Sequence, residues 1–328
     1  MAKVIGLGNA LVDIMTPLGD DEILKQIDFP KGSMQLVDAD KSKEVLKLTS
    51  HIKSQLASGG SAANTIHGIA RLGMDTAFVG KIGPDEYGKI FRQDLVDSHI
   101  TPALFETQTE TGRAVAMVTP DSERTFATYL GAAVELSATD ITPDIFKGYD
   151  MLHIEGYLVF NEELIETAVR IAKEQGLEIS LDLASFNVVD AKLDFLQRIT
   201  KQYVDIVFAN EEEARSFTGQ DDPEKALEMI AEIVKVSVVK VGKEGSFILK
   251  DGEKTKVGVI DATSRDTTGA GDLYAAGFLV GYLNDMSMTQ AGKIGALLAG
   301  KVIEVIGAKM EDSTWDEILT EVERIKKS

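Results

Sequence analysis

Several kinds of chemistry are excluded by what this chain of 328 residues lacks. It contains no cysteine, so disulfide bonds, thiolate metal sites and a cysteine nucleophile are all excluded. Basic residues are scarce, because 34 lysines and arginines stand against 53 aspartates and glutamates, which gives a net charge of −19. A surface this acidic repels nucleic-acid phosphates and anionic lipid headgroups. We therefore expect neither nucleic acid nor a membrane as a partner.

Long apolar runs are also missing. No stretch approaches the roughly 20 apolar residues that span a bilayer, and the first residues form no apolar leader with a small-residue cleavage site. A cytoplasmic location is therefore the default expectation. The histidines show no short-range metal spacing and give a zinc site no support; they are His51, His67, His99 and His153.

The rest of the composition, with 44% hydrophobic residues and 7 prolines, is that of a globular protein. Short β-rich runs alternate with amphipathic stretches of helical length, a pattern typical of a parallel sheet covered by crossover helices. The predicted strands are 4–7, 77–80, 151–154, 179–183, 206–209 and 236–241, and the helices among them are 61–72, 86–98, 162–175 and 223–235. We expect an α/β fold with three layers, α/β/α, around a mainly parallel central sheet.

Two segments, 14–37 and 103–129, do not follow this alternation of strands and helices. Within the second, residues 113–118 and 124–129 alternate in a way that favours antiparallel strands exposed on one face. We expect these segments to form a small β-sheet lid inserted in one domain that spans 1–328, since no linker is visible. Near the C-terminus the sequence predicts a hairpin of 245–250 and 256–260 around Asp251 and Gly252, followed by helices at 270–282, 289–306 and 315–326.

The most informative segment is Asp266-Thr-Thr-Gly-Ala-Gly-Asp272, which leads into an apolar helix. Gly269 and Gly271 let a ligand approach backbone N–H groups, and the helix directs its positive dipole end toward that ligand. The segment therefore predicts an anion hole. Asp272, in the first helical turn, could accept a proton from a substrate hydroxyl as a general base. The alternative is that Asp272 only caps the helix.

A second glycine cluster, Ser58-Gly-Gly-Ser-Ala-Ala-Asn64, also precedes a helix. Gly59 and Gly60 would let a hydroxylated ligand approach the backbone, and Asn64 offers an amide one turn into the helix. A glycine-rich turn between a strand and a helix is, however, more often only a turn. Taken alone, this cluster is a weak signal.

Polar side chains also follow the first strand. Asn9 and Asp13 lie beyond its carboxyl end, where ligands gather in open parallel sheets. The pair Gly6 and Gly8 suggests a dinucleotide fold, but Leu11 stands where the third glycine is required, so that fingerprint fails. No Gly-Lys pair here is followed by Ser or Thr, and no His-Arg-Asp sequence occurs, which disfavours P-loop enzymes and protein kinases.

Two further strand ends carry candidate groups. Asn210 and Glu213 follow the strand 206–209 and could hold hydrated Mg²⁺ through oxygen atoms. They could as readily form a solvated first helical turn that the helix dipole favours. The segment from Lys240 through Gly242 to Gly245 fits the wall of a nucleotide pocket or a plain hairpin turn.

In combination, these segments resemble the PfkB, or ribokinase, family of carbohydrate and nucleoside kinases over essentially the whole chain. The stretch 266–272 matches the family's C-terminal signature, and Gly59-Gly60 with Asn64 and the stretch 80–88 match its N-terminal one. The adenosine kinase branch is the most similar. The similarity to that branch rests on residues 9–13, on Gln35 together with the segment 38–41 that follows it, and on the stretches 123–125 and 129–132.

The resemblance implies a ribokinase-like fold and ATP-dependent phosphorylation of a hydroxymethyl group. It implies that Asp272 is the base and that an anion hole forms from Gly269, Ala270 and Gly271. Sugar hydroxyls would be bound by Asn9, Asp13, Gly59, Gly60 and Asn64. Gln35 and Tyr157 would face the purine base of the nucleoside, and Phe126 or Phe186 would complete an aromatic sandwich around it. The residues that would face ATP are Arg124 from the lid, Asn210, Lys240, Gly242, Gly245 and Thr268. Glu213 would position Mg²⁺ through water, and K⁺ would lie near Asp266 and Thr268.

Three functions stay open at this point. The first is a nucleoside kinase, most simply one that converts adenosine and ATP to AMP and ADP. The second is a sugar kinase for ribose, fructose or a related compound, and the third is a catalytically silent nucleoside or sugar sensor. A purine requires an aromatic and apolar slot between lid and core, whereas a site for sugar alone should be lined by polar groups. The chain could be a monomer or a homodimer, because lid edges can stay free or pair.

Overall fold

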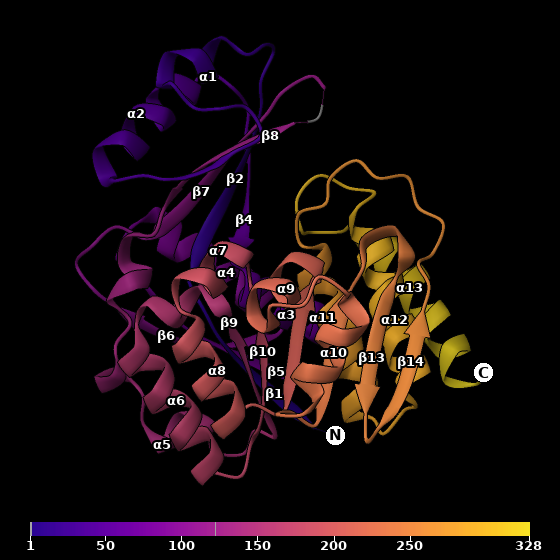
Figure 1. Cartoon of the computed structure of the whole chain (residues 1–328). Helices are drawn as coiled ribbons and strands as arrows, with labels where there is room; N and C mark the ends of the chain where they lie inside the picture. Colours follow the sequence, from indigo (N-terminus) through magenta and orange to yellow (C-terminus); the bar gives the residue numbers. More distant parts are fainter. Residues whose placement is uncertain (1, 122) are drawn as a thin grey trace.

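In the computed structural model, which describes residues 2–121 and 123–328, a large sheet lies between two layers of helices and a smaller sheet extends beyond one end of it (Figure 1). Met1 and Ser122, which fall inside the predicted domain and the predicted lid, lie outside the described residues. The predicted α/β class with a large, mainly parallel sheet and a second small sheet is confirmed. No helix in the described ranges combines the length and the apolar character needed to cross a bilayer.

The large sheet has nine strands in the order β14-β13-β12-β11-β10-β9-β1-β5-β6. All neighbours from β12 to β6 are parallel, and β13 pairs antiparallel with both β12 and β14. The strands are β1 (Lys3–Leu7), β5 (Asp75–Ile82), β6 (Ile100–Glu106), β9 (Met151–Glu155), β10 (Glu178–Asp182), β11 (Ile206–Asn210), β12 (Val236–Lys240), β13 (Ser246–Lys250) and β14 (Glu253–Val257). Because the parallel strands share a direction, their carboxyl ends lie along one edge.

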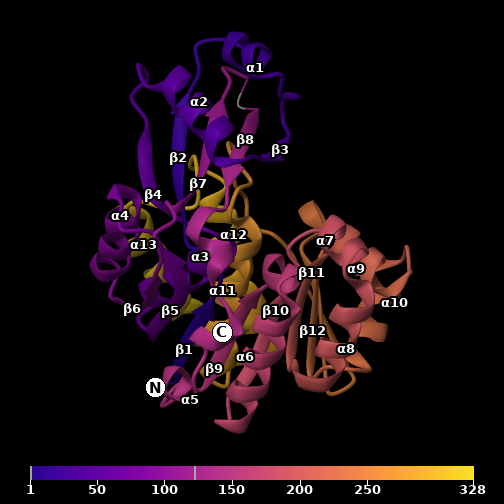
Figure 2. The ribbon, with the colours of Figure 1, turned by 90° about the vertical axis from the view of Figure 1, so that its left-hand side faces the viewer.

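Side chains alternate between two cores, one on each face of this sheet. In β1, Val4 packs into one core and Ile5 into the other. The first core is covered by α3 (Ser61–Arg71), α4 (Glu86–Asp97), α11 (Ala270–Leu283), α12 (Met288–Val302) and α13 (Asp312–Lys326). The second is covered by α5 (Pro143–Phe146), α6 (Glu162–Glu174), α7 (Phe186–Ala191), α8 (Leu193–Tyr203), α9 (Glu211–Thr218) and α10 (Pro223–Ala231) (Figure 2).

The lid is a five-stranded sheet in the order β3-β8-β7-β2-β4, beside two short helices at the top of Figure 1. Its elements are β2 (Leu11–Pro17), α1 (Glu22–Ile27), β3 (Met34–Leu36), α2 (Ala39–Thr49), β4 (Gln55–Gly59), β7 (Gly112–Val118) and β8 (Arg124–Tyr129). The predicted lid boundaries differ from the structure in several places, the first being that β2 begins at Leu11 and not at residue 14. Residues 103–106 belong to the large sheet, because β6 pairs with β5 there, and 55–59 form a lid strand that was not predicted.

The C-terminal hairpin turns as predicted at Asp251 and Gly252, whose φ values of 51° and 80° are those of a type I′ turn. Its second strand begins at Glu253, three residues earlier than expected, because the register pairs Glu253 with Lys250 across the tight turn. After Val257 the chain leaves the sheet and crosses α12, where Ile260 fills the space that a side chain at Gly300 would need. This crossing segment reaches the site described next.

Candidate active site

A cleft of about 1960 Å³ lies between the lid and the carboxyl edge of the large sheet. Its walls come from β2, β3 and β8 of the lid, from the ends of β9 to β12, and from the first turns of α3 and α11. The structure brings most of the predicted site residues together here. Those that line the cleft are Asn9, Asp13, Gly60, Asn64, Tyr157, Asn210, Glu213, Lys240, Gly242, Gly245, Thr268, Gly269, Ala270, Gly271 and Asp272.

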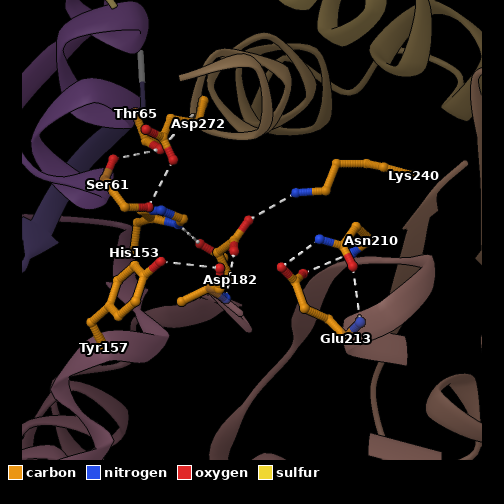
Figure 3. A network of polar contacts seen from close by, with 11 residues as sticks. Ser61, Thr65, His153, Tyr157, Asp182, Asn210, Glu213, Lys240 and Asp272 are labelled. Atoms are coloured by element: carbon orange, nitrogen blue, oxygen red, sulfur yellow. Dashed lines mark hydrogen bonds and ion pairs between the residues drawn. The ribbon is translucent and has the colours of Figure 1, made fainter. Parts of the chain in front are cut away.

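Asp272 is held by a neighbouring helix rather than by its own. The Ser61 hydroxyl donates to Asp272 Oδ1 at 2.7 Å (Figure 3), and Asn64 Nδ2 donates to Oδ2 at 3.0 Å. Both donors lie in the first turn of α3. The two helices approach closely because Gly68 has no side chain, since a Cβ there would lie 2.7 Å from that of Ala276. The carboxylate therefore faces the cleft with both oxygens oriented, and a helix-capping interaction is not what the structure shows.

The ionisation of Asp272 reflects two opposing effects. Burial raises its pKa to about 6, while the hydrogen bonds from Asn64 and Ser61 favour the charged form. A carboxylate with a pKa near 6 is ionised at neutral pH and is a stronger base than an ordinary aspartate. Ser61 was not predicted as a site residue, although it stands directly after the glycine pair that the sequence analysis identified.

The first turn of α11 presents backbone to the cleft at Gly269, Ala270 and Gly271. Gly269 begins the helix with a φ of 76°, in the left-handed region that favours glycine. The next residues carry N–H groups that a helix leaves without intrahelical partners. Gly271 faces open space, in which the nearest atom to an added Cβ would be Lys240 Nζ at 3.0 Å. An anion can therefore approach the backbone closely at this point.

Polar groups for a hydroxylated ligand surround the end of β1. The Asp13 carboxyl group fills the space beside Gly59, where a Cβ would lie only 2.3 Å from its Cγ. Gly59 itself does not line the cleft; its lack of a side chain makes room for Asp13. Burial raises the pKa of Asp13 to about 7, partly offset by Lys309. Asp13 therefore lies in a desolvated position where hydrogen bonds from ligand hydroxyls would be strong.

Glu155, at the end of β9, is a buried site residue that the sequence analysis missed. Its carboxylate accepts from the Asn9 backbone N–H at 2.9 Å, from Asn9 Nδ2 at 2.6 Å and from the Ala62 N–H at 2.9 Å. Burial raises its pKa to about 7 despite these donors. Glu155 thus fixes both Asn9 and the start of α3. The signal for it was an acidic residue directly after the apolar run 151–154.

Asn210 and Glu213 form a capping box at the start of α9. Glu213 N donates to Asn210 Oδ1 at 2.8 Å, and the Glu213 carboxylate accepts from Asn210 N at 2.8 Å and Nδ2 at 2.7 Å. The helical turn, one of the two interpretations left open, is therefore present, with Glu211 and Glu212 exposed to solvent. Glu213 is buried, and burial together with the charge of Asp182 raises its pKa to about 7. A buried carboxylate at this edge can still offer lone pairs to a cation.

Gln35 does not line the cleft, so its contact with a base stays a prediction without support from this geometry. Side chains alternate along β3, so Met34 and Leu36 line the cleft while Gln35 points to the other face. Their partners on β8 follow the same pattern, because Phe126 and Thr128 line the cleft. The Gln35 amide donates instead to Ser33 Oγ at 3.0 Å.

Arg124 connects the lid to the loop before α11. It forms an ion pair with the buried Asp266 and a hydrogen bond with Thr268 Oγ1. Asp266 also accepts from the backbone N–H of Thr268 at 2.5 Å and of Gly307 at 2.7 Å. Neither Arg124 nor Asp266 lines the cleft, so the arginine holds the lid against the loop rather than facing the anion hole directly.

Two apolar regions line the cleft together with Asp272. The first lies between lid and core, and several of its side chains are large and exposed, with Leu36 at 66% and Phe160 at 61%. This slot comprises Met34, Leu36, Phe126, Val134, Tyr157 and Phe160. The second, a trough beyond the anion hole, comprises Val259, Ile260, Ala296, Ala299, Gly300 and Ile303. Phe186, an alternative partner for Tyr157, does not line the cleft, and the sequence analysis did not predict the trough.

Comparison with known proteins gives three findings. The family described as pfkB family carbohydrate kinase matches residues 33–315. A probable sugar kinase protein from Rhizobium etli CFN 42 and the adenosine kinase from Sinorhizobium meliloti are similar structures, each 36% identical, with TM-scores of 0.88 and 0.87 over 98% of this chain and 98% and 99% of theirs. An uncharacterized sugar kinase from Archaeoglobus fulgidus is 30% identical over 251 residues, 74% of this chain and 96% of that protein.

Proposed function

This chain belongs to the pfkB family of carbohydrate kinases, and on that premise we propose that it is an adenosine kinase that transfers the γ-phosphoryl group of ATP to the 5′-hydroxyl of adenosine. The observation that supports a nucleoside over a simple sugar is the apolar slot between lid and core. A sugar offers hydroxyls and little apolar surface, so it would leave Leu36, Val134 and Phe160 exposed to water. A purine ring would cover side chains of this kind.

The ribose of the nucleoside lies, in this proposal, between the slot and Asp272. The Asp13 carboxylate accepts hydrogen bonds from its hydroxyls, and the Asn64 side-chain amide can both accept and donate them. Asn9 and Gly60 complete this wall of the cleft. The 5′-hydroxyl then points toward the Asp272 carboxylate. The purine lies against Tyr157 and Phe126 at the entrance. This arrangement uses the polar and the apolar lining for the two parts of one molecule.

ATP occupies the other half of the cleft. Its adenine lies in the trough of Val259 and Ala299, and its triphosphate reaches the first turn of α11 between Gly269 and Gly271. During transfer, the 5′-hydroxyl gives its proton to Asp272 while its oxygen forms a bond to the γ-phosphorus. The bond from that phosphorus to the oxygen of ADP breaks, and ADP leaves with the electron pair. Positioning and charge stabilisation account for such a step without covalent chemistry by the protein.

Two cations are part of this proposal. Glu213 fits Mg²⁺ held through water, because its buried carboxylate lies beside the charge of Asp182 at the phosphate end of the cleft. The ion, when bound, supplies charge neutralisation to the phosphates. Asp266 and Thr268 fit a monovalent cation such as K⁺, and in this structure their cationic partner is the guanidinium of Arg124.

The test is an assay of ADP release with Mg²⁺ and K⁺ present, across nucleosides and sugars. We expect adenosine to support turnover with AMP as the product, and 5′-deoxyadenosine, which lacks the acceptor hydroxyl, to bind without ADP release. Turnover with ribose or fructose alone would favour the sugar kinase. If every compound binds without ADP release above the buffer rate, the chain is a sensor and the proposal fails.

The slot itself can be tested by substitution. Leu36→Ser removes apolar contact with the purine, so KM for adenosine should rise roughly tenfold while KM for ATP stays constant. Leu319→Ser, on α13 and 40% exposed, is the matched control and should change neither value. An unchanged KM for adenosine in Leu36→Ser would argue against a purine in the slot.

The sugar kinase is kept as the second candidate because sugar kinases are among the relatives, one of them at 36% identity over nearly the whole chain. The polar set of Asn9, Asp13 and Asn64 would serve a free sugar as well as a ribose. The slot would then have to accept a larger apolar or aromatic substituent on that sugar. Comparison of adenosine with ribose in the assay above separates the two candidates.

A further inference from the structure

The ammonium group of Lys240 lies where a cation is normally disfavoured. Lys240 ends β12, and its side chain reaches past β11 to Asp182 at the end of β10, where Nζ lies 3.1 Å from Oδ2 (Figure 3). A Cβ added to Gly271 would lie 3.0 Å from the same Nζ. The ammonium is therefore in front of the first turn of α11.

A helix N-terminus carries a partial positive charge, so it repels cations and attracts anions. Lys240 is nevertheless charged. Burial lowers its pKa, but the carboxylates of Asp182, Glu213 and Asp272 outweigh burial and raise the pKa above its ordinary value. Asp182 contacts the ammonium directly, whereas Glu213 and Asp272 act on it from further away. The ammonium and the first-turn N–H groups of α11 face each other across the space that Gly271 leaves open, an arrangement that an anion between them would stabilise.

Resting on the proposed function, we propose that Lys240 is a catalytic residue that binds the γ-phosphoryl group of ATP, and that Asp182 is the positioning residue that holds its ammonium at the anion hole. The migrating phosphoryl group spreads negative charge over three oxygens. Backbone N–H groups of α11 face these oxygens from one side and Lys240 from the other. Fixed donors in a site that excludes water stabilise such charge most effectively.

A purely structural ion pair is the alternative, and the same sheet offers one for comparison. Lys173 pairs with the buried Asp205 at the opposite, amino edge of the sheet, where Asp205 also accepts from the Ile179 N–H at 2.8 Å. That pair lies away from the cleft. Lys173→Met therefore removes a lysine from a buried aspartate without touching the anion hole, and it is the matched control for Lys240→Met.

The test compares binding of a non-hydrolysable ATP analogue with an imido bridge between the β- and γ-phosphorus and binding of ADP, both with Mg²⁺, by titration calorimetry. In Lys240→Met the affinity for the analogue should fall about tenfold or more while that for ADP changes little, because only the analogue carries a γ-phosphate. Turnover should fall by about 10²-fold. Lys173→Met should change none of these values.

Two further variants separate positioning from folding. Asp182→Asn should lower turnover less than Lys240→Met, since the ammonium is kept but loses its anchor. Lys240→Met leaves the Asp182 carboxylate unpaired and could therefore fail to fold. In that case the double variant Asp182→Asn with Lys240→Met removes the unpaired carboxylate charge. The double variant should show the same loss of affinity for the ATP analogue relative to ADP. Equal loss of analogue and ADP affinity, or undiminished turnover in a folded Lys240→Met, overturns the proposal. Because the calorimetry needs no acceptor, it tests Lys240 even if adenosine is not the substrate.

Discussion

Ser61 on α3 and Asp272 on α11 are 211 positions apart in the sequence, yet the serine hydroxyl donates a 2.7 Å hydrogen bond to the aspartate. Asn64, one turn further along α3, donates to the other carboxylate oxygen. In the proposed function, the base would thus be oriented by the helix that also presents Asn64 to the sugar. Substrate position and base position would then be set by the same rigid element, which is what a near-attack geometry needs.

Asp272→Asn should lose about 10²-fold or more in turnover, because the amide cannot accept the proton. Binding of adenosine should change little, and the fold should be retained, since the Asn64 amide can rotate to present its oxygen to the new amide. Steady-state kinetics and calorimetry with adenosine measure the two effects. Unchanged turnover would show that Asp272 is not the base.

The pH dependence should report the ionisation of Asp272. Only the ionised carboxylate is a base, and burial raises its pKa to about 6, so kcat/KM should be level above that pH and fall as the pH drops through it. Ser61→Ala removes a hydrogen bond that stabilises the ionised form. The pKa should therefore rise further, and the acidic limb should move to higher pH.

Other buried carboxylates serve as a check on that assignment. Asp13 and Glu155 have pKa values of about 7, each raised by burial, and neither accepts a hydrogen bond from Ser61. Ser61→Ala should therefore shift only the limb that belongs to Asp272. A profile of Ser61→Ala that coincides with that of the unmodified enzyme would assign the limb to another group.

Arg124→Met should uncover a requirement for a monovalent cation. The guanidinium neutralises the buried Asp266, so its loss leaves an unpaired buried charge at the loop before the anion hole. We expect turnover to fall in Na⁺ or in a tetraalkylammonium salt and to recover in part with K⁺, which Asp266 and Thr268 can then bind. Kinetics in a series of chloride salts measures this. Equal activity of the variant in every salt would contradict it.

The sheet and its helices could be predicted because the strands that are buried on both faces read as continuous apolar runs. Ile206 to Ala209 is an example, and all four of these residues are buried. The strand Gln55–Gly59 could not be predicted, because its first residues are exposed and its pairing with β2 is antiparallel and distant in sequence. Such edge strands are defined by their partners more than by their own sequence.

The glycine-rich parts of the site were predictable for a related reason. Glycine at 269 and 271 marks close backbone approach, which is a local property of the chain. Glu155 and Asp182 were not predicted because each is a single acid at the end of a strand, and their importance comes from Asn9 and Lys240, which are distant in sequence. The position of Gln35 away from the cleft could not be predicted, because strand alternation depends on a register that three residues alone do not define.

Gly271→Ala adds a single methyl group, which should lower turnover without lowering thermal stability. Alanine is the better helix former by about 1 kcal/mol, so the melting temperature should not fall. The added Cβ would lie 3.0 Å from Lys240 Nζ, the end of a flexible side chain that can move aside at little cost. Its displacement would remove the ammonium from the anion hole, and the methyl group would occupy the place of a phosphoryl oxygen. Turnover should then fall by about 10²-fold, and adding Lys240→Met should reduce it little further, because both changes remove the same interaction.

Gly19→Ala, at a lid position with no atom within 4 Å, is the control and should leave kinetics unchanged. Full additivity of the two active-site changes would mean that Gly271 and Lys240 act on different parts of the reaction.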